Sequence, residues 1–257
     1  MRTHVDPKIF LTYRAKDIQT KMSSNPTCIE IEDEAALALR KLESHDFDQA
    51  PVVSKGTVIG WIVRKDIMQD RPIENSFHRL SHRDLISDEA PLDDALRRLV
   101  QQELIFTIGS EGIVGFVVRS DIERHVARAH MYLLISGLEI LMTKNVELER
   151  LSTEELVRLM SDDSRDAFYK KKARREDANP VEYLNLRALG RATAKNQRIM
   201  NHIGMSAKDW DEYIYTLTNI RNWVAHSNTQ ELLDHPFFDI VQKLNKTEDI
   251  IHRLNKY

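Results

Sequence analysis

This sequence has a single cysteine, a nearly balanced charge and no long apolar run. Cys28 is the only cysteine among 257 residues, which excludes an internal disulfide and favours a reducing compartment. A net charge of −3 argues against a broadly basic surface that coats polyanions. The most apolar run, residues 131–142, is too short and too interrupted to span a bilayer, and residues 1–20 hold no apolar signal segment. We therefore expect a cytoplasmic protein with no membrane partner.

Motifs of common catalytic and metal sites are missing too. The sequence has no glycine loop that would cradle phosphate, no zinc-spaced set of histidines and cysteines, and no nucleophile elbow. This argues against a metabolic enzyme and predicts no metal site. The composition, with 42% hydrophobic and 30% charged residues, is that of a globular protein. A chain of this length can form two domains that each bury a core.

An internal repeat organises the first half of the chain. The segment GWIVRKDI from Gly60 recurs as GFVVRSDI from Gly115, and DEAALALRKL from Asp33 recurs in outline as DEAPLDDALRRL from Asp88. Each repeat predicts a helix, then two strands joined by a glycine-containing turn, then a second helix that opens near the aspartate of the repeated segment.

The second half carries only helical patterns. Strand signals stop after about Asp121, and no proline interrupts residues 121–143. The last helix of the second repeat is therefore predicted to run directly into the helical half, and the alternatives are a frayed junction near Arg128 or a break at Ser136 and Gly137. The fold class predicted is α+β, with repeats at about 15–72 and 73–128 in a first domain (1–128), followed by an all-helical domain (129–257).

The two repeats resemble a tandem pair of CBS domains, a regulatory module of βαββα units that usually binds adenosine nucleotides between its halves. The resemblance covers roughly residues 15–128. It implies that Asp66 and Asp121 hold ribose hydroxyls, with a phosphate near the amides of the helix that follows. Arg64 and Arg119, two residues earlier, are expected to pair with phosphate oxygens. The implied ligand is ATP, ADP, AMP or a related signalling nucleotide, acting as a regulator.

A purely structural role for both aspartates remains open. Asp66 and Asp121 would then only cap their helices, while the neighbouring arginines are solvated. Val63 and Val118 stand where the family often has a threonine or serine, so both sites lack a hydroxyl that commonly contacts the ligand.

A helix late in the chain holds an arginine, an asparagine and a histidine in the segment RNWVAH. Ser206 followed by Asp209 resembles a capping box, which predicts a helix from near Ala207 to about His226. Arg221 lies within its apolar stripe, where a guanidinium is costly unless a carboxylate or a phosphate meets it. The other residues of the stripe are Trp210, Tyr213, Ile214, Leu217, Ile220 and Val224.

This pattern on an all-helical domain is similar to the HEPN family, many of whose members are metal-independent ribonucleases that work as dimers. The resemblance implies that His226 is a general acid or base, that Arg221 stabilises charge on the phosphate, and that Asn222 orients the other two or the substrate. The expected protein is a homodimeric, nucleotide-regulated endoribonuclease that needs no cofactor for catalysis.

Two less specific interpretations stay open. The helical half could serve only for RNA binding or dimerisation, with His226 a solvated residue near a helix C-terminus. A basic cluster is predicted to hold an RNA backbone by counterion release, although a solvated helix is the usual role of such a run. This cluster consists of Lys170, Lys171, Lys172, Arg174 and Arg175.

Overall fold

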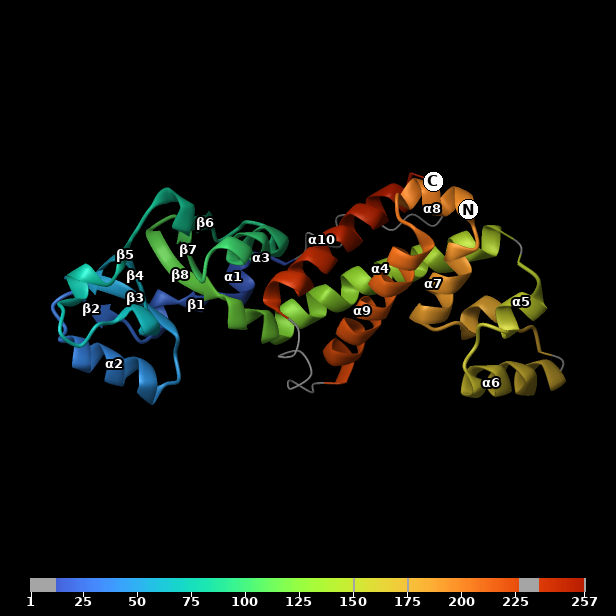
Figure 1. Cartoon of the computed structure of the whole chain (residues 1–257), viewed down its shortest axis with the longest axis horizontal. Helices are drawn as coiled ribbons and strands as arrows, with labels where there is room; N and C mark the ends of the chain where they lie inside the picture. The colour runs from blue at the N-terminus through green and yellow to red at the C-terminus, as the bar shows by residue number, and fades with distance from the viewer. Residues whose placement is uncertain (1–12, 150, 175, 227–235, 257) are drawn as a thin grey trace. The chain divides into compact units, whose positions relative to one another are not determined.

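A computed structural model of the chain describes residues 13–149, 151–174, 176–226 and 236–256, with His226 described by its backbone alone (Figure 1). The chain divides into two compact units, an N-terminal unit of residues 11–127 and a C-terminal unit that contains residues 128–257. Within the described ranges, no helix is long and apolar enough to cross a membrane.

The N-terminal unit is built on two sheets, and its described residues place four strands in each (Figure 1). The strands of the first sheet are, in spatial order, β2 (Ile29–Glu30), β3 (Gln49–Ser54), β4 (Thr57–Val63) and β5 (His78–Arg79). The strands of the second sheet are, in spatial order, β1 (Thr20–Lys21), β8 (Gly112–Val118), β7 (Leu104–Gly109) and β6 (Leu85–Ser87). In each sheet one pair is parallel, β2 with β3 and β6 with β7, and its crossover is a helix, α2 (Ala35–Ser44) or α3 (Leu92–Gln101). These helices and hairpins confirm the elements that the repeat predicts.

Each sheet is completed by a short strand from the other repeat. Strand β1 precedes the first repeat's own strands but pairs with β8 of the second repeat. Strand β5 opens the second repeat but pairs with β4 of the first. The exchange is equivalent in both directions, since Thr20 lies opposite Phe116 and His78 lies opposite Trp61. Neither sheet is complete without the other repeat.

The glycine of the repeated segment is required at this exchange. A Cβ on Gly60 would collide with the carbonyl oxygen of His78, and a Cβ on Gly115 would lie 2.7 Å from the carbonyl oxygen of Thr20. Both clashes are with backbone atoms, which cannot rotate away. The two glycines therefore allow the exchanged strands to approach closely.

Two hydrophobic clusters stabilise the N-terminal unit. One fills the space between the first sheet and α2, and includes Ala38, Leu42 and Ile62. The other includes Phe106 and Phe116 of the second sheet together with Trp61 of the first. Because the second cluster draws side chains from both sheets, the repeats share a core.

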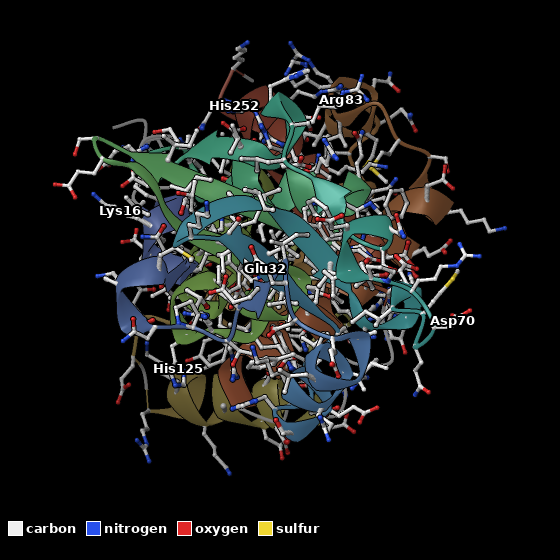
Figure 2. The ribbon with its side chains drawn as sticks, turned by 90° about the vertical axis from the view of Figure 1, so that its left-hand side faces the viewer. Lys16, Glu32, Asp70, Arg83, His125 and His252 are labelled. Carbon is white, nitrogen blue, oxygen red and sulfur yellow. The ribbon has the colours of Figure 1, made fainter. Side chains whose placement is uncertain are left out.

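A short 3₁₀ turn stands at each of the two aspartates, η3 (Arg64–Asp66) and η6 (Arg119–Glu123). In the first repeat no α-helix follows this turn, whereas in the second repeat the expected helix opens at His125, four residues after Asp121. Pro72 leaves too few residues for a helix in the first repeat, because proline also disfavours helical geometry in the residue before it. Asp70, in that intervening segment, is exposed and lies at the periphery of the view in Figure 2. No α-helix begins at either aspartate itself, and the phosphate site at a helix N-terminus stays a prediction.

The predicted helix that runs from the second repeat into the helical half is found, but it begins later than expected. Arg124 is extended, with φ −60° and ψ 145°, and separates η6 from α4 (His125–Leu148). From His125 onward α4 is continuous for 24 residues, so neither alternative, a frayed junction near Arg128 or a break at Ser136 and Gly137, is found.

The described residues of the C-terminal unit form helices and turns without a strand, as the sequence predicts. The helix predicted from its capping box is α9 (Ala207–His226), and its bounds agree with the prediction. Gly204 ends α8 (Gln197–Ile203) with a positive φ of 76°, and Pro236 precedes α10 (Phe237–Leu254). After α4 the α-helices are α5 (Thr153–Val157), α6 (Asp162–Ala173), α7 (Leu186–Ala194), α8 (Gln197–Ile203), α9 (Ala207–His226) and α10 (Phe237–Leu254).

Helix α9 is central to the packing of this unit (Figure 1). Trp210 is fully buried and donates its indole N–H to the carbonyl oxygen of Gly190 in α7, at 2.8 Å. Tyr213 is hydrogen-bonded at 2.6 Å to Thr247 of α10, and both side chains are buried. A side chain at Gly190 would overlap Ile214, so α7 and α9 are in close contact. The apolar stripe of α9 thus forms part of the core, as predicted.

We expect Gly60→Ala to destabilise the N-terminal unit by about 1–3 kcal/mol or more, because the added methyl group displaces the backbone of β5. Urea unfolding measures the change in the free energy of unfolding. Thr57→Ser, at an exposed position of the same strand, is the control and should stay within about 0.5 kcal/mol of wild type. Wild-type stability for Gly60→Ala would contradict the strand exchange.

Candidate functional site

A cavity of about 530 Å³ lies beside Asp121 in the N-terminal unit. Both repeats contribute to it: residues 20–27 and 46–49 come from the first, and residues 116–124 from the second. Its walls combine aromatic and apolar side chains with charged ones, as ligand sites commonly do. The lining residues that the chemistry uses are Thr20, Phe47, Phe116, Ser120, Asp121 and Arg124.

The carboxylate of Asp121 is buried and already holds two hydrogen bonds. The backbone N–H of Val118 donates to one oxygen at 2.8 Å, and Nε of Arg124 donates to the other at 2.6 Å. Burial raises the pKa of Asp121, and these two donors partly oppose that rise. Asp121 thus caps its own turn, as the structural alternative holds. A carboxylate has about four lone-pair positions, so roughly two remain for a ligand.

Arg124 is a residue of this cavity that the sequence did not single out. Besides Asp121, it contacts the exchanged strand, donating to the hydroxyl of Thr20 at 2.7 Å and to the carbonyl oxygen of Gln19 at 3.3 Å. The first repeat has Gln69 at the equivalent position. A departure from the repeat was therefore the available signal, and it concerns the repeat aspartate that lines this cavity.

A second cavity, of about 480 Å³, adjoins the first and shares Asp48, Gln49 and Ser120 with it. It brings together Arg64 and Arg119, which the sequence predicted as phosphate ligands, and adds Lys65. The predicted residues Arg64, Arg119 and Asp121 therefore lie around two adjoining cavities.

Both arginines also have structural partners. Arg64 forms ion pairs with Asp48 at 2.9 Å and Asp46 at 3.6 Å. Nε of Arg119 donates to the carbonyl oxygen of Leu99 at 2.8 Å, near the C-terminal end of α3. Arg64 is the more easily recruited of the two, because its acidic partners are largely exposed.

Asp66 has different surroundings from Asp121. Its carboxylate lies 3.3 Å from Nε2 of His78, in the exchanged strand β5. The imidazole of His78 stacks on Trp61, with 4.3 Å between ring centroids. Neither of the two cavities described above is lined by Asp66.

In the C-terminal unit, Arg221 and Asn222 differ in exposure. Arg221 is half-buried, and its Nε is buried without a hydrogen-bond partner among the described residues. Asn222 is exposed. Burial raises the pKa of Glu139 in α4, and the charge of Arg221 opposes that rise. Glu139 is thus a carboxyl group close enough for the charge of Arg221 to act on it. The side chain of His226 lies outside the described residues.

The end of α9 that carries this motif is fastened to α4 by Arg128. Its Nη2 donates to the carbonyl oxygens of Trp223 and Val224, at 3.0 and 3.1 Å, and its guanidinium lies 4.9 Å from the centre of the Trp223 ring. Arg128 is only 7% exposed. It therefore satisfies carbonyl groups at the helix end and restricts the position of the adjacent motif.

The basic cluster lies on α6 and just after it. Lys170, Lys172 and Arg174 are exposed and Lys171 is half-buried. Arg175 lies outside the described residues. The ammonium group of Lys172 lies 5.8 Å from the centre of the Phe168 ring. These positions leave open both the RNA-binding and the solvated interpretation.

Comparison with known proteins supports the resemblance found for the first repeat. Residues 15–71 match the family model of the CBS domain, so the chain contains a CBS domain. No curated protein matches the chain. The HEPN resemblance of the helical half stays a prediction.

Solved structures similar to the chain include the CBS-pair protein CBSX2 from Arabidopsis thaliana, with 15% identity, a TM-score of 0.40, and coverage of 46% of this chain and 96% of that one. A CBS domain-containing protein of unknown function from Bacillus anthracis has 17% identity, a TM-score of 0.40, and coverage of 45% and 93%. The putative acetoin utilization protein AcuB from Vibrio cholerae has 15% identity, a TM-score of 0.38, and coverage of 44% and 88%. Each match spans less than half of this chain.

The raised pKa of Asp121 predicts a pH dependence of stability. The folded protein holds this proton to a higher pH than the unfolded chain, whose aspartates titrate near about 3.9. Stability from this group is therefore full below that pH and falls as pH rises through the interval between the two pKa values. Asp121→Asn cannot titrate, so wild-type stability minus variant stability should fall as pH rises from 3 to 7 in urea unfolding. A difference that grows with pH would contradict this, and Asp70→Asn is the exposed control.

Proposed function

We propose that the N-terminal unit binds an adenine nucleotide in the cavity beside Asp121, and that this ligand regulates the C-terminal unit. The observation that carries the proposal is a buried carboxylate with lone pairs to spare, in a cavity with an aromatic wall. The adjoining cavity is lined by three cationic side chains, Arg64, Lys65 and Arg119, and by the carboxylates of Asp48 and Glu103. The CBS domain at residues 15–71 supports a nucleotide as the ligand class.

Each part of a nucleotide has a matching group in the two cavities. Vicinal ribose hydroxyls can donate to the remaining lone pairs of Asp121. The ring of Phe47 is 43% exposed and lines the cavity, so it offers a face on which adenine can stack. Ser120 lines both cavities, and a phosphate chain that passes it reaches Lys65 and Arg64. In this arrangement the phosphates are held by the side chains of Lys65 and Arg64.

One ligand per chain is the stoichiometry that these contacts favour. The carboxylate of Asp66 is engaged by His78, and the stacked ring of Trp61 holds that imidazole in place. A ligand at the oxygen of Asp66 that His78 contacts would have to displace this imidazole. At Asp121 the space beside the carboxylate is a cavity.

Titration calorimetry with ATP, ADP and AMP should show binding of at least one of them, with one site per chain. Phe47→Ala should weaken binding by roughly 5-fold or more, because stacking of a base on an aromatic ring contributes about 1–3 kcal/mol. Asp121→Ala should weaken it further, with a thermal unfolding scan to show that the variant folds. Asp66→Asn is the matched control at the equivalent position of the first repeat.

Unaltered affinity in Phe47→Ala, or binding lost only in Asp66→Asn, would place the ligand elsewhere. No binding of any of the three nucleotides would overturn the sensor proposal.

A second function is proposed for the C-terminal unit, namely metal-independent endoribonuclease activity of a HEPN-type homodimer. The observation that favours it is Arg221 beside the exposed Asn222: the guanidinium is half-buried, and its buried Nε has no hydrogen-bond partner among the described residues. In the reaction, the RNA 2′-hydroxyl loses its proton and attacks phosphorus, and the leaving 5′-oxygen takes a proton. His226 acts as the general base that takes the 2′-hydroxyl proton or as the general acid that protonates the 5′-oxygen, and Arg221 stabilises the negative charge that builds up on the phosphate. The products are a 2′,3′-cyclic phosphate and a 5′-hydroxyl.

The helix geometry supports action as a dimer. Arg221 and His226 are five residues apart on α9, which places them about 140° apart around the helix axis. On a single helix, two side chains at this angle point in different directions and cannot easily reach one phosphodiester. Two copies of α9 facing each other would supply an arginine from one chain and a histidine from the other.

Structured RNA incubated with the protein in EDTA should be cleaved, with cyclic phosphate ends. His226→Ala should reduce the rate by about 10² to 10⁴, because a general acid or base is lost. The control is His252→Ala, at a histidine of α10 whose side chain is 49% exposed, which should cleave as wild type does. Equal cleavage by wild type and His226→Ala would point to a contaminating nuclease.

RNA binding without cleavage would instead support the non-catalytic alternative, in which the helical half binds RNA or dimerises.

Saturating nucleotide should change the cleavage rate, and RNA should then change nucleotide affinity by the reciprocal coupling. If neither changes, the regulatory link is wrong.

A further inference from the structure

Helix α9 presents a tyrosine on the same face as Asn222. Tyr215 is 49% exposed and lies two helical turns before Asn222, about 10 Å along the axis. Thr218 lies between them on this face, and its hydroxyl is turned to the backbone, donating to the carbonyl oxygen of Ile214 at 2.8 Å. The ring of Tyr215 is therefore the prominent feature of this face ahead of the motif.

We propose that Tyr215, backed by Arg187, is a stacking subsite for an unpaired RNA base that flanks the phosphate held at Arg221 and Asn222. This inference rests on the proposed ribonuclease or RNA-binding function, and it adds a specific contact to it. Tyr215 would be a positioning residue, because it holds the substrate strand without touching the reacting atoms.

The first support is the contact between the two side chains. The guanidinium of Arg187 lies 4.8 Å from the centre of the Tyr215 ring. Arg187 is half-buried, and its Nε is buried without a hydrogen-bond partner among the described residues. A guanidinium over one part of the ring fixes the ring orientation, while the exposed remainder stays open to a ligand.

The second support is the rigidity of the helices that carry these residues. Arg187 lies in the first turn of α7, whose N-terminus is capped by Asn185 through the backbone N–H of Ala188 at 2.9 Å. Helix α7 is held against α9 by the hydrogen bond from Trp210 to Gly190. The platform is thus built on packed helices rather than on a loop, which a precise contact requires.

The third support is the charge around the ring. Arg187 lies over the ring of Tyr215, and Arg221 follows six residues further along α9. Two acidic residues precede the ring by about one turn: Asp211 lies 3.7 Å from Arg191 in an ion pair, and Glu212 is exposed. Positive charge thus lies at the ring and on the side toward the motif, and bases of a polyanion can stack on an aromatic ring whatever their identity.

The test measures binding of a fluorescent single-stranded RNA by anisotropy, in the full chain with His226→Ala so that the RNA stays intact. Tyr215→Ala in this parent should weaken binding by about 5- to 150-fold, whereas Tyr215→Phe should bind like the parent because the ring is kept. The control is Tyr132→Ala, at a tyrosine of α4 that is 41% exposed, which should leave affinity unchanged.

A second arm separates stacking from a general structural effect. An RNA of the same length with abasic sugars throughout should bind the parent and the Tyr215→Ala variant equally, because no base remains to stack. Arg187→Ala should weaken binding of the normal RNA, and Arg187→Lys should restore part of the loss.

The outcomes distinguish the inference from the function on which it rests. If the parent binds RNA and Tyr215→Ala binds it equally well, the stacking subsite is wrong and the proposed function stands. If the parent binds no RNA, both are overturned. If Tyr215→Ala changes the oligomeric state in light scattering, the ring contacts a second chain, and the inference is again wrong.

Discussion

The exchange of one short strand between the repeats is the constraint on which the N-terminal unit depends. Each repeat lends a strand to the sheet of the other, and a glycine without a side chain permits the crossing. The exchange also delivers residues to the two aspartates, since Thr20 reaches Arg124 beside Asp121, and His78 reaches Asp66. A single repeat would have neither a complete sheet nor a complete set of contacts around its carboxylate.

The parts of the fold that depend on local signals could be predicted from the sequence. The hairpins and the helices α2 and α3 follow from the repeated pattern, and α9 follows from the capping pair Ser206 and Asp209 and its apolar period. The strand exchange could not be predicted in this way, because it depends on contacts between residues far apart in the chain, such as those of Arg124 with Gln19 and Thr20. For the 3₁₀ turn of the first repeat a local signal existed, since Pro72 follows it closely.

The same limit applies to the candidate sites. The repeated segment singles out Asp121, Arg64 and Arg119, and the structure places them around adjoining cavities. Arg124 is an unremarkable arginine in the sequence, and it matters because it reaches a residue 104 positions earlier. Glu139 and Arg187 likewise have their contacts with residues on another helix, Arg221 and Tyr215. A repeated motif can be found in the sequence, whereas the residues that contact it from elsewhere in the chain cannot.

The two repeats share their sheet topology but differ around the aspartate of the repeated segment. Beside one carboxylate there is open volume, and beside the other there are two stacked rings from the protein itself. If the proposed nucleotide occupies only the cavity beside Asp121, one chain offers no second site with which to cooperate. Its saturation would then follow a simple hyperbola, and any steeper, switch-like response would have to arise from the association of several chains.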